Sequence, residues 1–223
     1  MHKSNVFSLN CYQKAHLEVI VNQAKLQNIE KIFILEPTYK FYECEALYYQ
    51  IRSAYKIQNE WYLKVEKCSI LEYQNFIDEM KKIDFDIDIQ FGLLVQYSSE
   101  YEYFIEQIKK QYSYDLFVGC IDFIDNIIFD SMYSSNMLWE KYSEKYIFLR
   151  YYEMVFALIS SKLFDGIAHF DTIQKVHQYR SRFMIHHYRK CAMHLHLNQM
   201  FVIDSYLLPR FLNECNAFHV EIK

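Results

Sequence analysis

Short apolar runs alternate with stretches of helical periodicity along most of the chain. In residues 13–27, apolar side chains recur at spacings of three and four, which predicts a helix with one buried face. Further helices are predicted at residues 43–55, 70–83, 100–112, 134–162, 180–197 and 207–216. Strands are predicted at residues 6–9, 31–35, 86–97, 115–123, 165–169, 200–204 and 218–222. Residues 40–66 are ambiguous between a lid, a helix-containing loop and a long excursion over the sheet.

Alternation of strands and helices predicts a parallel sheet, either open or closed into a barrel. In such folds, functional side chains lie where strands end and loops begin. A chain of 223 residues without a linker-like stretch or repeat is expected to be one domain spanning residues 1–223.

The amino-acid composition excludes several classes of protein. Hydrophobic residues make up 52% and charged residues 23%, which is typical of a globular chain. The net charge of −4 comes without a basic stripe, so no nucleic-acid partner is expected. No 18-residue apolar run and no signal peptide are visible, so no membrane association is expected. Six cysteines without a C-x-x-C pair indicate reduced core cysteines of a cytoplasmic protein.

Three glycines and two prolines leave no glycine-rich phosphate loop, and no G-x-S-x-G nucleophile motif is present. His186, His187, His194 and His196 fall in one predicted helix. Their mutual spacing does not suit a metal pair on one helix face, so they are interpreted as surface or half-buried side chains.

Four segments carry a family resemblance. FGLLVQY at residues 91–97 is similar to a "G-L-E-V-D-Y" motif, and YDLFVGCIDF at residues 114–123, continuing to Phe129-Asp130, is similar to "Y-D-Y-V-I-G-S-V-H-F". LFDGIAHFD at residues 163–171 resembles "L-F-D-I-I-A-H-L-D", and HKSNVFS at residues 2–8 is a weaker match to "H-T-H-T-x-F-S". Together these motifs resemble the histidinol-phosphatase branch of the PHP superfamily.

The resemblance implies a distorted seven-stranded β/α barrel, similar to a TIM barrel, with metal ligands at the strand ends. In that family a cluster of divalent metals activates water against a phosphate monoester. Matched positions that keep a ligand-type side chain are His2, Glu36, Asp122, His169 and Asp171, and we treat them as a remnant metal site. Other ligand positions carry Ser4, Pro37 and Leu94, and one falls near Ile203, with Asp204 adjacent. The acid next to the Leu94 position is replaced by Gln96.

Each retained residue also has a structural interpretation. His169 fits a hydrogen-bonded core histidine, Asp122 a turn-capping acid and Glu36 a solvated loop acid, while His2 lies close to a chain terminus. No lysine or arginine falls in the matched motifs at residues 91–97, 114–123 and 163–171. Leucine cannot ligate a metal, and without an ion the remaining acids would repel a phosphate dianion.

Three functional hypotheses follow. The first is a catalytically silent PHP-type domain with a binding or regulatory role, without a cofactor. The second is an active phosphoesterase using Mn, Fe or Zn on histidinol phosphate or a similar small phosphorylated metabolite. The third is a truncated, decaying gene product. Because the family's last motif has no counterpart before Lys223, a second copy or another protein is expected to cover that side of the barrel.

Overall fold

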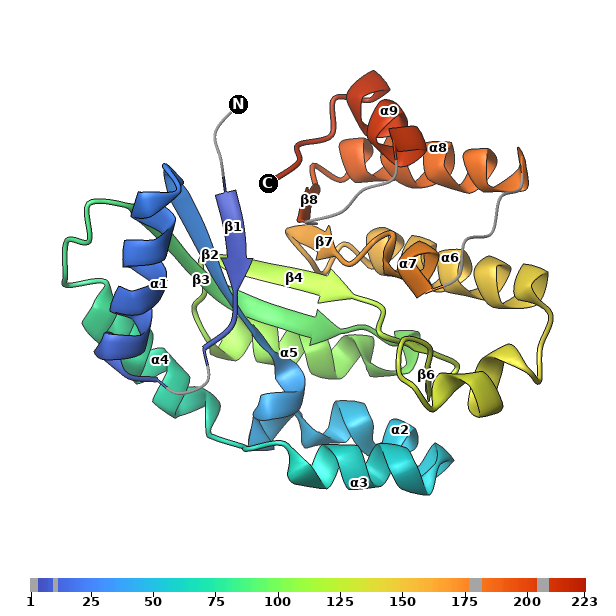
Figure 1. The fold of residues 1–223 in the computed structure, drawn as a ribbon, viewed down its shortest axis with the longest axis horizontal. Coiled ribbons are helices and arrows are strands. Elements are labelled where there is room, and N and C mark those ends of the chain that lie inside the picture. The colour runs from blue at the N-terminus through green and yellow to red at the C-terminus, as the bar shows by residue number, and fades with distance from the viewer. Residues whose placement is uncertain (1–3, 10–11, 177–181, 204–208) are drawn as a thin grey trace.

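The computed structural model describes residues 4–9, 12–176, 182–203 and 209–223. Six parallel strands in the order β1-β2-β3-β4-β7-β8 form one sheet that curls into a half-barrel (Figure 1). These strands are β1 (Ser4–Phe7), β2 (Lys31–Pro37), β3 (Asp88–Gln96), β4 (Leu116–Cys120), β7 (Gly166–Ala168) and β8 (Phe201–Ile203). A separate hairpin is formed by β5 (Phe123–Ile124) and β6 (Ile127–Ile128).

The parallel α/β organisation is confirmed, and the curled sheet is consistent with a TIM-like barrel. The seventh predicted strand, at residues 218–222, contributes only a parallel bridge between Ile222 and Val202 in the described chain. The amide of Val220 donates to Cys215 O (2.9 Å) and closes the preceding helix. Only the last residues are therefore extended beside β8, where Val202 N donates to Glu221 O (2.9 Å).

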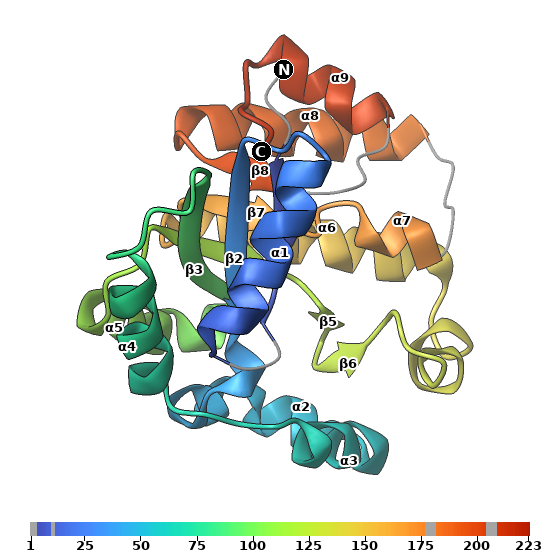
Figure 2. The same ribbon diagram turned by 60° about the vertical axis from the view of Figure 1, so that its left-hand side comes forward.

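Helices connect the strands and cover the convex face of the sheet (Figure 2). The α-helices are α1 (Lys14–Leu26), α2 (Tyr49–Ala54), α3 (Lys56–Lys64), α4 (Ile70–Met80), α5 (Glu102–Gln111), α6 (Glu144–Ser161), α7 (Thr172–Val176), α8 (Arg182–Leu197) and α9 (Pro209–Ala217). Short 3-10 or π turns are η1 (Thr38–Lys40), η2 (Tyr42–Tyr48), η3 (Ser99–Tyr101) and η4 (Ser135–Trp139). In the parts of the chain that the structure describes, none of the helices has the length and apolar character needed to traverse a bilayer.

Two hydrophobic clusters lie on opposite faces of the sheet. The larger cluster fills the space between the convex face and the helices. The smaller one lies on the concave face and consists of Phe33, Leu35, Leu116, Val118, Ala168, Phe201 and Ile203, with Leu94 packed against it. Because side chains alternate along a strand, odd-numbered residues of β2 point into the half-barrel and even-numbered ones point toward the helices.

One continuous helix at residues 134–162 was predicted, and the structure corrects this. A π turn, η4, ends at Trp139, and α6 begins only at Glu144. Ser143 explains the interruption, because its hydroxyl accepts from Tyr146 N (3.3 Å) and starts a new helix as its N-cap.

The ambiguous segment 40–66 folds into η2, α2 and α3, so it is helical rather than a loop. Its beginning is joined to α4 by Glu43, whose carboxylate accepts from Ser69 Oγ (2.7 Å) and Ile70 N (3.0 Å). Ser69 is also the N-cap of α4 in a capping box with Glu72. Burial alone would raise the pKa of Glu43, but the bonds from Ser69 and Ile70 outweigh it and lower that pKa.

Replacing Glu43 with glutamine is expected to cost roughly 1 kcal/mol of unfolding free energy at neutral pH, because two bonds to a carboxylate are weakened. Since folding lowers the pKa of Glu43, its contribution is present above the ordinary value of 4.5 and is lost as pH falls through the folded-state pKa. Urea denaturation from neutral to acidic pH should therefore show that the unfolding free energies of the wild type and Glu43→Gln become equal at acidic pH. Glu18→Gln, in an exposed pair with Lys14, is the control and should change stability by less than about 0.5 kcal/mol.

Candidate functional site

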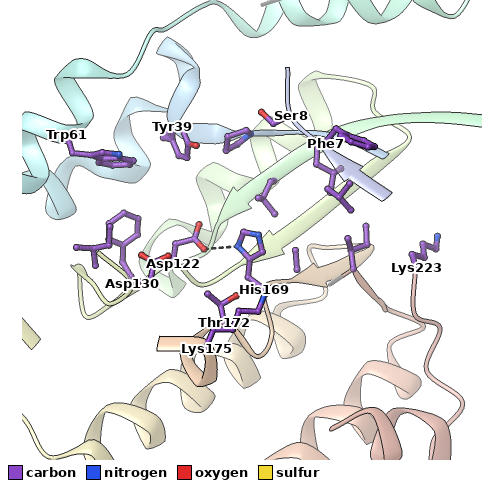
Figure 3. Close-up of a pocket in the computed structure, with 18 residues that line it drawn as sticks. Phe7, Ser8, Tyr39, Trp61, Asp122, Asp130, His169, Thr172, Lys175 and Lys223 are labelled. Carbon is purple, nitrogen blue, oxygen red and sulfur yellow. Dashed lines mark hydrogen bonds and ion pairs between the residues drawn. The ribbon is translucent and has the colours of Figure 1, made fainter. Parts of the chain in front are cut away.

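A cavity of about 640 Å³ opens at the carboxyl ends of the parallel strands (Figure 3). Much of its wall is apolar or aromatic. The lining residues are Val6, Phe7, Ser8, Leu35, Pro37, Tyr39, Trp61, Leu94, Asp122, Phe123, Ile128, Asp130, Ala168, His169, Thr172, Lys175, Ile203 and Lys223. This is the location at which parallel α/β folds place their functional groups.

Asp122 and His169 meet in this cavity, as Figure 3 shows. Asp122 follows β4 and His169 follows β7, and the parallel pairing of these two strands brings the residues together. Asp122 Oδ1 lies 3.0 Å from His169 Nδ1, and 32% and 43% of the two side chains are exposed. The pair is therefore accessible from the cavity, and it is not part of the apolar core.

The backbone of His169 adopts a left-handed conformation with φ of 62°. This region is unfavourable for residues with a side chain, and the surroundings hold it. His169 O accepts from Tyr151 Oη (2.7 Å) and from Thr172 N (3.1 Å), the first residue of α7. The turn directs the imidazole back toward Asp122 (Figure 3).

Cys120 lies at the end of β4 directly behind Asp122. Its thiol donates to Asp122 Oδ2 (3.2 Å) and to Val95 O (3.5 Å), and the residue is only 1% exposed. Burial, followed by the negative charge of Asp122, raises the pKa of the Cys120 thiol well above its usual value. The sequence indicated only a core cysteine here, because a strand-end thiol beside an acid two residues away carries no recognisable motif.

Among the described residues, Cys120, Asp122 and His169 form the one group of three metal-ligand side chains whose donor atoms all lie within 4.8 Å of one another. One thiol, one carboxylate and one imidazole match the ligand types and number of a single tetrahedral zinc site with one open position. A single zinc ion thus fits these residues, whereas a cluster of ions would need more donors.

Asp130 follows the β5–β6 hairpin and faces the same cavity (Figure 3). Although the residue as a whole is exposed, loss of hydration around its carboxyl group raises its pKa, followed by the charge of Asp122. The charge of His169 lowers that pKa and offsets part of the effect. Two acids lining one cavity favour a bound cation over a bound anion.

Glu36 does not join this group. Its side chain points to the helix-covered side of β2, is 0% exposed and does not line the cavity. Lys40 Nζ lies 2.8 Å from Glu36 Oε2, Ser8 Oγ donates to the same oxygen (3.1 Å), and Leu9 N donates to Oε1. The interpretation of Glu36 as a solvated loop acid is wrong, because this carboxylate is fully buried and neutralised by Lys40.

Asp171 is also fully buried and lies outside the cavity lining. Its Oδ1 accepts from Tyr152 Oη (3.2 Å), which belongs to α6. His2, the remaining predicted ligand, lies outside the described residues, as does Asp204. Of the five retained positions, the structure therefore brings together Asp122 and His169.

The substituted ligand positions Pro37, Leu94 and Ile203 face the cavity with side chains that cannot ligate a metal. Pro37 and Leu94 form part of its wall. Gln96 is buried and used structurally, because its Oε1 accepts from Asp122 N (2.9 Å) while its Nε2 donates to Tyr97 O (3.0 Å). Gln96 thus fixes the backbone of Asp122.

Two cationic side chains reach the cavity from outside the matched motifs. Lys175 comes from α7, and Lys223 comes from the extended C-terminal segment (Figure 3). The ammonium of Lys223 lies 3.8 Å from the Phe201 ring centroid and 3.8 Å from Glu221 Oε2. Sequence spacing did not reveal either residue, because α7 and the last residues are placed by tertiary packing. The four histidines of α8 are exposed or half-buried, as predicted, and they do not line the cavity.

No protein-family model and no curated protein matches the sequence. Solved structures match the fold, and two of them are described here. A protein from Listeria monocytogenes assigned as the histidinol phosphatase HisK superposes with a TM-score of 0.73 at 16% identity, covering 99% of this chain and 93% of its own. Histidinol phosphate phosphatase from Lactococcus lactis, crystallised with zinc, L-histidinol and phosphate, superposes with a TM-score of 0.67 at 11% identity, covering 97% and 79%.

At such low sequence identities, the structural superpositions establish the fold and leave the activity open. The matches extend over nearly the whole chain and agree with the motifs at residues 91–97, 114–123 and 163–171. The resemblance predicted from those motifs is confirmed, and the chain has the fold of the PHP-type histidinol phosphatases.

Proposed function

We propose that this chain is a single PHP-type domain that binds a small ligand in its strand-end cavity and does not hydrolyse phosphate esters. The observation that carries the proposal is the cavity wall. Pro37 and Leu94 stand where the family resemblance expects ligands, and the carboxylate of Glu36 is turned away and paired with Lys40. Asp122 and His169 alone do not supply the donors of a cluster of metal ions.

Phosphate monoester hydrolysis requires that charge on the phosphoryl oxygens be neutralised and that water be deprotonated near neutral pH. Several metal ions meet both requirements together. In this chain, Asp122 and Asp130 add negative charge to the cavity, which Lys175 and Lys223 also line. This arrangement of charges supports the binding of a ligand more readily than the hydrolysis of a phosphate ester.

The cavity volume of about 640 Å³ suits a metabolite-sized molecule. Tyr39, Trp61 and Phe123 offer aromatic surface, with Tyr39 and Trp61 in edge-to-face contact at 5.3 Å. The Lactococcus relative was crystallised with histidinol and phosphate, which supports a small phosphorylated compound as the ligand class.

We take the bridge between Val202 and Ile222 as the position of a seventh strand that extends the half-barrel toward closure. The cysteines at positions 44, 68, 120, 191 and 215 are unpaired, which supports a reducing, cytoplasmic location.

A working phosphoesterase is the second candidate, favoured by the Cys120, Asp122 and His169 group and by the zinc in the Lactococcus structure. To separate the two, the purified protein is loaded with Zn²⁺, Mn²⁺ or Mg²⁺ and phosphate release from histidinol phosphate is measured. The Lactococcus enzyme serves as positive control. We expect no release above the protein-free background. Metal-dependent release that disappears in His169→Gln would reject the silent domain and establish the phosphoesterase.

A further inference from the structure

A ligand set that differs from the one implied by the family resemblance lies at the end of β4. Cys120 Sγ is 3.2 Å from Asp122 Oδ2, and Asp122 Oδ1 is 3.0 Å from His169 Nδ1. All three donor types lie within 4.8 Å of one another. Each of the two short contacts places a hydrogen between a pair of atoms that would both be metal ligands.

The frame around these donors is rigid. Parallel pairing of Val118 with Gly166 and of Gly119 with Ile167 sets β4 beside β7. Gln96 holds the amide of Asp122, and Tyr151 holds the carbonyl of His169. Donors at the ends of paired strands and supported by further hydrogen bonds need little rearrangement to coordinate an ion.

The three donor side chains can be reached only from the side of the cavity. Cys120 is buried at the back, while Asp122 and His169 line the cavity. An ion entering from the cavity would contact the two accessible donors first and the thiol last. Three protein ligands would leave one coordination position of a zinc ion open for a ligand atom or water.

We propose that Cys120, Asp122 and His169 bind one zinc-class divalent cation, with Cys120 as a thiolate ligand. This inference rests on the proposed function, because it replaces a catalytic cluster by a single ion that anchors a ligand in the cavity. On binding, the Cys120 proton is released to solvent and the imidazole proton moves from Nδ1 to Nε2, so that all three donors carry free electron pairs. A thiolate favours Zn²⁺ and Co²⁺ over Mg²⁺ and Mn²⁺, which prefer oxygen ligands.

Cobalt titration of the metal-free full chain tests this inference. We expect an intense near-ultraviolet thiolate-to-cobalt absorption that saturates at one equivalent and disappears when Zn²⁺ is added. Cys120→Ser should abolish the absorption and weaken binding by more than the roughly 10–100-fold typical of changes to residues that only support a ligand. Cys44→Ser removes another fully buried thiol, outside the donor group, and should leave the absorption unchanged.

His169→Gln changes an accessible side chain and serves as a second variant if Cys120→Ser does not fold. It should weaken Co²⁺ binding while the folded protein, checked by circular dichroism, persists. Absence of the thiolate absorption in the wild type, or its persistence in Cys120→Ser, would overturn the inference. Phosphate release with more than one ion per chain would instead reject the proposed function, so the two failures are distinguishable.

Discussion

Replacing Glu36 with alanine is expected to lower the free energy of unfolding by roughly 3 kcal/mol, even in protein stripped of metal by a chelator. The carboxylate is fully buried and accepts bonds from Lys40, Ser8 and Leu9. Its removal leaves the Lys40 ammonium, only 19% exposed, without its counter-charge. Chemical denaturation of both proteins in the presence of a chelator measures the difference.

A double-mutant cycle isolates the ion pair. Lys40→Met alone should also destabilise the chain, and the combined variant should lose less than the sum of the two single losses, because both remove the same interaction. Glu60→Ala, whose carboxylate is 44% exposed and lies 3.6 Å from Lys56, is the matched control and should cost less than about 1 kcal/mol. A loss at Glu36 that occurs only with metal bound would assign this residue to metal binding instead of to the fold.

Gly92→Ala is expected to destabilise the chain by about 3 kcal/mol, which is the upper end of the range typical of overpacked cores. A Cβ at this position would lie 2.2 Å from the carbonyl oxygen of Leu116 and 2.9 Å from Leu35 Cδ2. The carbonyl belongs to the paired strand β4, so β3 and β4 must separate to admit the methyl group. Urea denaturation followed by circular dichroism should show a lower midpoint.

Gly119→Ala provides the comparison, because the three atoms nearest to its Cβ would all belong to the Leu158 side chain, with Cδ1 closest at 2.8 Å. A side chain can change rotamer, whereas a backbone carbonyl in a sheet cannot move without loss of pairing. The cost at Gly119 should therefore be clearly smaller than at Gly92. Equal costs at both positions would contradict the assignment of Gly92 to a close approach of strand backbones.

The positions of the helices and strands were largely predictable from the pattern of apolar residues. The predicted helix at residues 13–27 corresponds to α1 (Lys14–Leu26), and the predicted strand at residues 86–97 corresponds to β3 (Asp88–Gln96). The interruption before α6 was missed, because a serine N-cap inside a long apolar periodicity changes the pattern very little. The last strand was overestimated, because the closing bond from Val220 N to Cys215 O depends on where α9 packs.

The sequence by itself determined the alternation of strands and helices, the family resemblance of the fold, and two side chains of the cavity, Asp122 and His169. Both follow apolar strands directly, and parallel strands bring such positions to one edge of a sheet. Only the tertiary structure decided that Glu36 points to the helices and that Cys120 points to Asp122. The strands of this sheet are apolar on both faces, so alternation along the chain does not reveal which face lines the cavity until neighbouring strands and helices have packed.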